Sequence, residues 1–289
     1  MQFLSFYTGH KAAVLSLAGH AKEPLFYSAG ADGLIVRWSV HDPDQGDVLT
    51  RINGIMPSIT FDKTSNSLFA ALNQKGVVRI NCTSGKNELV VPIPSTSFTK
   101  IEHLENWLVV ITKIGELIVI DTNIWKIVHR ITIGPDKVSS FTLAGGKFWS
   151  YGLQGIGKIG FEQNNFSKID EANFSDQAFI TAIGSRILLV YNSKLNVVDM
   201  KRPAKILLDN VYEERRVMKL MGGLNAPGAI ALLEDGDMQV IKWNKKEVFV
   251  ESTVQNKHYG TLNDLLWSEN HKFVVTAGKD KNIGIWRFN

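Results

Sequence analysis

The sequence predicts an all-β protein, because three observations agree. Short apolar runs of strand length recur along all 289 residues, turn residues separate them, and helical periodicity is almost absent. The clearest unit is a hairpin of two apolar runs around a short turn, as in residues 25–29, 31–33 and 34–38. With 44% hydrophobic and 21% charged residues, the chain has the composition of a globular protein and not of a disordered or collagenous one.

This hairpin recurs about every 40 residues. Its turns fall near residues 33, 76, 115, 155, 193, 236 and 281, and further strand-like runs flank each hairpin, which makes four short strands per repeat. Such a series is typical of a β-propeller, whose blades bury both faces against their neighbours. We therefore expect a single domain over residues 1–289, a seven-bladed propeller of four-stranded antiparallel blades, with six or eight blades as alternatives. The predicted blades cover about residues 9–52, 55–93, 97–133, 137–170, 177–210, 214–252 and 258–289.

The two ends of the chain are expected to pair. Residues 286–289 end the third strand of the last predicted blade, and the strand-like residues 2–7 precede the first repeat. Pairing residues 2–7 with the last blade would complete its four strands and remove an open sheet edge. The N-terminal strand is therefore predicted to close the propeller.

Two repeats carry four polar or aromatic residues at one spacing, with offsets of 0, 18, 22 and 28 from a histidine. These are His10, Ser28, Asp32 and Trp38, and again His258, Thr276, Asp280 and Trp286. With the Gly9-His10 pair, this pattern resembles the WD40 repeat. The resemblance implies that each set forms a buried hydrogen-bonded tetrad, for which carboxylate, imidazole, hydroxyl and indole N–H are suitable partners.

The middle repeats depart from this pattern. Isoleucine or valine stands near the tryptophan position, at Ile80, Ile120 and Val198, and the aspartate position holds Gln74, Ile114 and Gln154. The sixth repeat is intermediate: Asp237 lies six residues before Trp243, and Arg215 stands where the histidine would be. We expect the divergent blades to be held together by apolar packing.

The composition of the chain limits which partners and which cellular compartment we expect. The net charge of +4 is too small to name a nucleic-acid partner. The single cysteine, Cys82, excludes an intramolecular disulfide and indicates a reducing compartment. No apolar run approaches the ~20 residues of a membrane span. We expect a cytoplasmic protein without membrane insertion, with the nucleus also open.

The sequence gives little sign of catalysis. The seven histidines show no metal-ligand spacing, and no nucleophile elbow is present. Residues 155–160 match G-x-G-x-x-G, but a dinucleotide site needs a strand before the motif and a helix after it, and here the segment itself reads as a strand. We therefore expect no catalytic residue, no metal, no cofactor and no enzyme activity.

The resemblance implies a non-catalytic protein–protein interaction scaffold, either a monomeric propeller or a subunit of a larger hetero-complex. WD40 proteins bind protein or peptide partners on the top face, formed by the turns between the second and third strands and by the loops before the first strands. The matching positions here are Lys11, Ala31, Asn73, Lys113, Gln154, Asn192, Glu234, Tyr259 and Lys279.

Two alternatives stay open. Basic residues of the fifth and sixth repeats, at 201–205, 215–216, 242 and 245–246, could bind RNA or an acidic surface. A small ligand or substrate could instead bind at the central channel mouth, which would require converging acids or bases on the top loops.

Overall fold

The computed structural model describes residues 1–20, 22–132, 140–144, 147–152, 155–160, 166–168, 179–183, 185–191, 194–212, 215–222, 228–268 and 271–288. All regular structure in these residues is β, in seven four-stranded antiparallel sheets. The chain divides into two compact units: residues 1–130 with 257–289, and residues 131–256. No helix in the described residues is long and apolar enough to cross a membrane.

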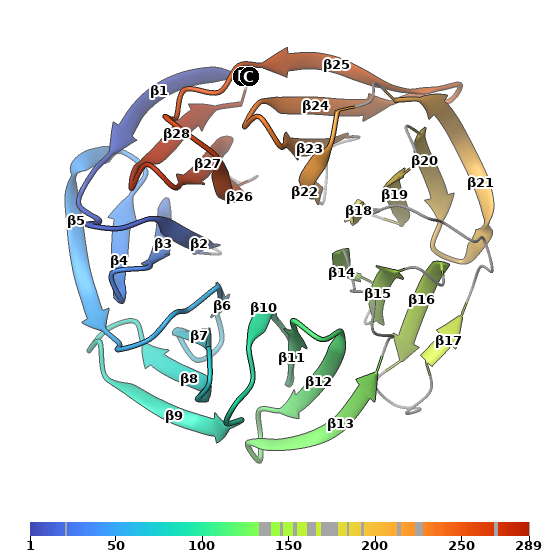
Figure 1. Ribbon diagram of the computed structural model, residues 1–289. Helices are drawn as coiled ribbons and strands as arrows, with labels where there is room; N and C mark the ends of the chain where they lie inside the picture. Colours follow the sequence, from blue (N-terminus) through green and yellow to red (C-terminus); the bar gives the residue numbers. More distant parts are fainter. Residues whose placement is uncertain are drawn as a thin grey trace. The chain divides into compact units, whose positions relative to one another are not determined.

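The first unit contains four sheets (Figure 1). One joins β2 (Val14–Gly19), β3 (Leu25–Gly30), β4 (Leu34–Ser39) and β5 (Asp42–Arg51). The next joins β6 (Ser58–Asp62), β7 (Ser67–Leu72), β8 (Gly76–Asn81) and β9 (Asn87–Pro92). The third joins β10 (Phe98–Leu104), β11 (Trp107–Thr112), β12 (Glu116–Asp121) and β13 (Lys126–Thr132). The fourth joins β26 (Leu262–Ser268), β27 (Phe273–Gly278), β28 (Ile283–Arg287) and β1 (Gln2–Tyr7).

The predicted pairing of the chain ends is confirmed in this fourth sheet. Strand β1 pairs antiparallel with β28, and Tyr7 lies opposite Ile283. The aromatic residues of β1 also cover the last repeat, because the Phe3 and Trp286 ring centroids lie 4.9 Å apart, as do those of Phe6 and His258. The N-terminal strand therefore supplies both hydrogen bonds and apolar cover to the C-terminal sheet.

The second unit contains three sheets. They join β14 (Ser140–Ala144), β15 (Lys147–Gly152), β16 (Gly155–Gly160) and β17 (Phe166–Lys168); then β18 (Phe179–Ile183), β19 (Arg186–Tyr191), β20 (Lys194–Asp199) and β21 (Arg202–Val211); and then β22 (Val217–Gly222), β23 (Gly228–Leu233), β24 (Met238–Trp243) and β25 (Val248–Val254). The G-x-G-x-x-G segment forms strand β16, as the sequence predicts.

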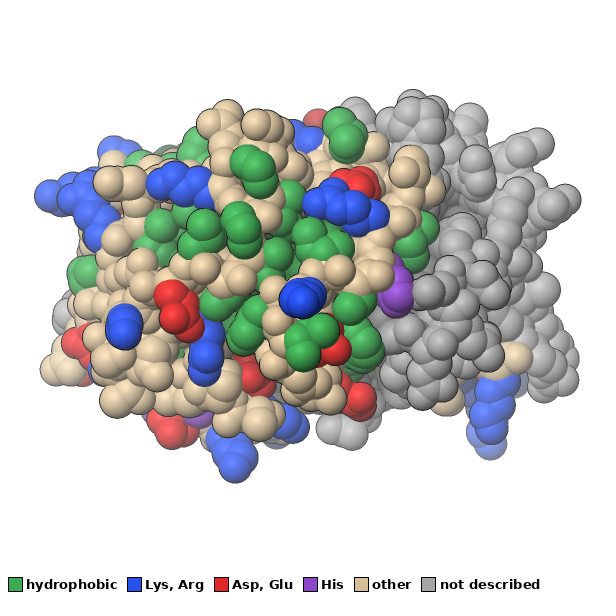
Figure 2. Space-filling view, turned by 90° about the horizontal axis from the view of Figure 1, so that it is seen from below, with side chains coloured by type: hydrophobic (Ala, Val, Ile, Leu, Met, Phe, Trp, Pro, Cys, Tyr) green, Lys and Arg blue, Asp and Glu red, His purple; other side chains and the backbone are tan. Residues whose placement is uncertain are grey.

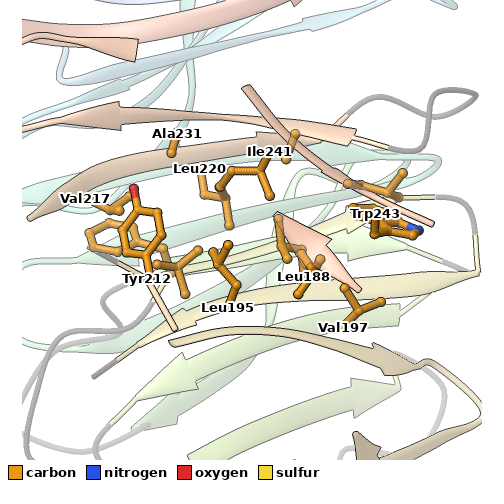
Figure 3. Packing of buried hydrophobic residues seen from close by; sticks show 14 of the residues in the cluster. Leu188, Leu195, Val197, Tyr212, Val217, Leu220, Ala231, Ile241 and Trp243 are labelled. Atoms are coloured by element: carbon orange, nitrogen blue, oxygen red, sulfur yellow. The ribbon is translucent and has the colours of Figure 1, made fainter. Parts of the chain in front are cut away.

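Buried side chains fill the space between neighbouring sheets. In the second unit one cluster joins Leu188, Leu195 and Val197 of the β18–β21 sheet to Leu220 and Ile241 of the β22–β25 sheet (Figure 3). In the first unit the outer strands carry a mixed surface. Figure 2, seen from the side where β9 and β13 lie in Figure 1, shows hydrophobic side chains among charged ones on this wall.

The predicted single seven-bladed ring needs correction. The structure shows an all-β chain of four-stranded antiparallel blades, but four of these sheets pack into one compact unit and three into another. The spacing of the repeats predicts the number of strands, but it does not determine which blades pack together. The packing of blades depends on the side chains between the sheets. That residues 1–289 form one domain stays a prediction.

Candidate functional site at the loop edge of the first unit

The turns and loops of the first unit meet at one edge of each sheet. The turn after the second strand of a sheet donates a backbone N–H to the loop before the first strand of that sheet. These hydrogen bonds run from Ala31 to Ala13 at 2.8 Å, Asn73 to Ile55 at 3.0 Å, Lys113 to Ser97 at 2.8 Å, and Lys279 to Thr261 at 3.0 Å. Each turn is therefore fixed to its neighbouring loop.

Hydrogen bonds between the inner strands place these edges on the same side of the unit. The Asp264 carboxylate of β26 accepts from the Leu17 N–H of β2 at 2.7 Å and from the Ser16 hydroxyl at 3.1 Å. The Ser16 hydroxyl oxygen in turn accepts from the Ile59 N–H of β6 at 3.1 Å. Because these residues are second to fourth in their strands, the strands begin at the same level. We call the edge formed by residues 8–13, 31–33, 52–57, 73–75, 93–97, 113–115, 257–261 and 279–282 the loop edge.

The first predicted tetrad is assembled beside the loop edge. His10 Nδ1 lies 3.1 Å from both Asp32 carboxylate oxygens, and His10 Nε2 lies 2.7 Å from the Ser28 hydroxyl. The Trp38 indole N–H donates to the same hydroxyl oxygen at 2.8 Å. Ser28 lies on β3 and Trp38 on β4, whereas His10 comes from the loop before β2 and Asp32 from the turn between β3 and β4.

The second tetrad repeats this geometry in the last sheet. His258 Nδ1 lies 2.9 Å from Asp280 Oδ1, and His258 Nε2 lies 2.8 Å from the Thr276 hydroxyl. The Trp286 indole N–H donates to that hydroxyl at 3.0 Å. The contacts in both sheets match the spacing found in the sequence.

Two glycines make room for the tetrads, a requirement that our sequence reasoning missed. A Cβ atom on Gly30 would collide with the His10 ring and the Asp32 carboxylate, and one on Gly278 would collide with His258 and Asp280. Each glycine ends its strand two residues before the aspartate, so a Gly-x-Asp pair after the second strand is a signal that could have been used.

Both tetrad aspartates are held ionised. Burial alone would raise the pKa of Asp32, but the N–H groups of Lys11 and Leu34, with the His10 ring, outweigh burial and hold this pKa below its usual value. Burial would also raise the pKa of Asp280, but the His258 ring and nearby N–H groups lower it overall. Burial lowers the pKa of His258, and Asp280 only partly offsets this. A neutral imidazole therefore faces a carboxylate in the second tetrad.

The tetrads also fix residues at the surface. The Asp32 carboxylate accepts the Lys11 N–H at 2.7 Å, and the Asp280 carboxylate accepts the Tyr259 N–H at 3.0 Å. The side chains of both residues face solvent, and Tyr259 is 88% exposed. Each buried tetrad therefore orients the exposed residue that follows its histidine.

The other predicted contact positions are mostly accessible. Ala31, Lys113 and Lys279 are exposed on the loop edge, whereas Asn73 is half-buried and its side-chain oxygen accepts the Phe98 N–H at 2.8 Å. Glu234 is exposed in the second unit. Gln154 and Asn192 lie outside the described residues.

The sixth repeat differs from its predicted alignment. The N–H groups of Glu234 and Gly236 bond to Arg216 and Leu233, as those of Ala31 and Gly33 bond to Ala13 and Gly30. This register places Asp235 at the tetrad aspartate position and Ile241 at the tryptophan position, two residues before Asp237 and Trp243. The assignment from the sequence was wrong because Asp237 and Trp243 repeat the spacing of six residues.

The basic residues of the second unit do not gather on one edge. Arg215 forms ion pairs with Asp235 and Asp237, and Arg216 lies 3.2 Å from Glu234, all at the start of the β22–β25 sheet. Lys201 and residues 245–246 follow third strands, which places them at the opposite edge of their sheets. Lys242 pairs with Glu251 at 2.6 Å. Within the described residues, therefore, Arg215, Arg216 and Lys242 are paired with acidic residues, and Lys201, Lys245 and Lys246 lie at the opposite edge. No group of three or more His, Cys, Asp or Glu side chains suited to a metal occurs in that same part of the chain.

Comparison with known proteins agrees with the tetrads. Residues 1–39 and 250–287 match the WD40 family model, described as WD domain, G-beta repeat. The chain is similar in structure to the WD40 beta propeller domain of Doa1, with 14% sequence identity over 98% of this chain and 95% of that one, and a TM-score of 0.78.

Two further solved structures share the fold. A chain in the crystal structure of the Mitotic Checkpoint Complex has 10% identity over 99% of this chain and 95% of that one, with a TM-score of 0.84. The computationally designed Ika8 protein has 12% identity over all of both chains, with a TM-score of 0.71. The predicted resemblance is confirmed: the first and last segments of this chain match the WD40 family model, and its fold is similar to that of solved WD40 propellers.

Proposed function

We propose that this chain is a non-catalytic interaction scaffold that binds a protein or peptide partner on the loop edge of its first unit. WD40 propellers typically act as protein-interaction scaffolds, which supports the general class. The observation that carries the proposal for this edge is the attachment of Lys11 and Tyr259 to the buried tetrads.

Rigid attachment favours binding because a fixed loop loses little conformational freedom when a partner docks. The N–H groups of both residues are held by ionised aspartates, and the turns beside them are hydrogen-bonded to neighbouring loops. Ile55, Ile114 and Tyr259 are 53%, 73% and 88% exposed on this edge. Exposed apolar and aromatic side chains on an ordered surface are the composition expected at a protein contact.

Site-specific photo-crosslinking in the native cell tests this proposal. A photoreactive phenylalanine analogue at position 113 or 259 should form a covalent adduct with another protein after irradiation. The matched controls place the analogue at Lys63 or Lys86, which are exposed in turns at the opposite edge of the same unit. Adducts from positions 63 and 86 only, or from none of the four, would refute the loop edge as the binding surface.

A further inference from the structure

The loop edge of the two tetrad sheets has an unbalanced charge. Four exposed lysines lie there with Tyr259: Lys11, Lys257, Lys279 and Lys281. The only carboxylates in these loops and turns belong to Asp32 and Asp280, whose side chains are just 7% and 6% exposed and are bound by histidine and backbone N–H groups. We call Lys11, Lys257, Tyr259, Lys279 and Lys281 the tetrad edge.

These lysines have no ion-pair partner in the described part of the chain, whereas other basic residues do. Arg37 pairs with Asp47 on the outer strands, and Arg215 and Arg216 pair with acidic residues in the second unit. The opposite edge of the first unit mixes exposed lysines with Glu23 and Glu105. The positive charge is therefore a local property of the tetrad edge and does not follow from the small net charge of the chain.

The two tetrad sheets are direct neighbours, which brings these residues onto one surface. Strands β26 and β2 are joined by the Asp264 contacts and by a 2.8 Å hydrogen bond from the Asn263 side chain to the Val14 carbonyl. Lys11 follows the histidine of one tetrad and Tyr259 that of the other. A partner lying across the two sheets could reach an aromatic side chain and several ammonium groups together.

We propose that the partner segment recognised at the tetrad edge is an acidic peptide, rich in Asp and Glu and carrying an apolar side chain that packs against Tyr259. This inference rests on the proposed function and adds the chemistry of the partner. Ammonium groups would attract carboxylates and speed the encounter, while the exposed aromatic ring would supply the desolvated contact that dominates affinity. A peptide is favoured over RNA because sequence-tolerant RNA binding uses a series of stacking aromatics, and the tetrad edge has one.

Fluorescence anisotropy with a labelled peptide of about twelve residues, mostly Glu and Asp around one Leu, tests this proposal. We expect saturable binding to the full chain that weakens severalfold as NaCl rises from about 50 to 300 mM, because salt screens exposed charges. The same peptide with Gln and Asn in place of the acids should bind at least tenfold more weakly. Equal binding of both peptides would overturn the inference.

Variants locate the contact. Lys11→Gln with Lys279→Gln should weaken the acidic peptide about fivefold or more, since each exposed ion pair contributes up to about fivefold. Tyr259→Ala should weaken it about tenfold or more. The matched control, Lys63→Gln with Lys86→Gln, removes the same charge from the opposite edge and should change affinity by less than about twofold. A control that loses as much affinity would show that only overall charge matters.

The remaining outcomes are also decisive. Tighter binding of an oligouridylate of similar charge than of the acidic peptide would assign the surface to RNA and overturn the inference. If the acidic peptide fails to bind while photo-crosslinks still form at position 259, the partner is not acidic but the proposed function stands. If neither occurs, both are wrong.

Discussion

Two adjacent sheets of the first unit solve the same packing problem by different chemistry. In the β2–β5 sheet, His10, Ser28, Asp32 and Trp38 form the tetrad. In the β6–β9 sheet the backbone hydrogen bonds of the turn have the same pattern, so the two sheets can be aligned. The four tetrad positions are then occupied by Ile52, Ala70, Gln74 and Ile80. Three of these four are buried in one apolar cluster. The four tetrad positions of a blade must therefore be filled and any polar group there hydrogen-bonded, but the residues at these positions need not be polar.

The difference between the sheets concerns the surface as much as stability. In the tetrad sheet the buried aspartate accepts the N–H of an exposed lysine and so fixes the loop. In the β6–β9 sheet Gln74 is exposed, and the loop is fixed by backbone hydrogen bonds and by the Asn73 side chain. Of these two sheets, only the tetrad sheet has a buried side chain, Asp32, that binds the backbone of the exposed residue after the histidine and so fixes its orientation.

The largest expected effect is in the apolar sheet. Ile80→Ala removes a side chain that is fully buried in its cluster, and we expect a loss of about 3 kcal/mol in the free energy of unfolding. The loss, measured by urea denaturation, should be the same at pH 7.5 and pH 5.5, because no ionisable group is involved. A cost below about 1 kcal/mol would mean that this position does not hold the blade together.

In the tetrad sheet, Asp32→Ala should cost about 2 kcal/mol at pH 7.5. It leaves the His10 ring and the N–H groups of Lys11 and Leu34 without their acceptor. Asp47→Ala, which breaks an ion pair whose aspartate side chain is 70% exposed, is the control and should cost less than about 0.5 kcal/mol. Equal effects of the two variants would contradict the structural role of the tetrad.

Acid should weaken the tetrad sheets through His258. Its pKa is lowered in the folded state, while the unfolded value is about 6.5. The unfolded chain therefore binds the proton first, and stability falls as the pH drops below about 6.5. Urea midpoints of wild type and His258→Gln at pH 7.5 and 5.5 should show a smaller acid loss in the variant.

Three other groups also contribute to the loss of stability in acid. Burial also lowers the pKa of His103 in β10, so part of the acid loss should persist in His258→Gln. Asp32 and Asp280, with lowered pKa values, should add a second loss only below about pH 4, when they become protonated. If the urea midpoint of His258→Gln falls between pH 7.5 and pH 5.5 by as much as that of wild type, His258 is not buried in its neutral form.

The smallest expected effect tests whether an aspartate alone makes a tetrad. Gln74→Asp places a carboxylate at the tetrad position of the β6–β9 sheet, where Ile52 stands in place of the histidine. Because the side chain is exposed and has no imidazole partner, the free energy of unfolding should change by less than about 0.5 kcal/mol. A gain of more than about 1 kcal/mol would show that the aspartate acts without the histidine.

Much of this fold is visible in the sequence because each strand and turn is a local signal. The tetrads were predictable from spacing, since four residue types at fixed offsets recur in two repeats. The role of Asp264 was not, because its partners Ser16 and Leu17 are almost the full chain length away. The sixth repeat was misaligned because a Trp and an Asp at the right spacing fitted a register that the strand pairing excludes.

The division into two units could not be predicted from the repeat either. Every repeat offers similar strands, and only the packed side chains decide which sheets belong together. Four of the predicted contact positions, Lys11, Lys113, Tyr259 and Lys279, are exposed on the loop edge, but that they bind a partner stays a prediction. The charge of this edge was not anticipated, because it depends on which carboxylates are buried.

The central claim is that a partner binds the loop edge of the first unit. Affinity purification from the native cell with quantitative mass spectrometry tests it most directly, comparing wild type, Lys11→Gln with Tyr259→Ala, and the control Lys63→Gln with Lys86→Gln, all first shown to have the same melting temperature. We predict that one set of proteins is retained by wild type and control and is lost with the loop-edge variant. Equal retention by all three chains would contradict the claim.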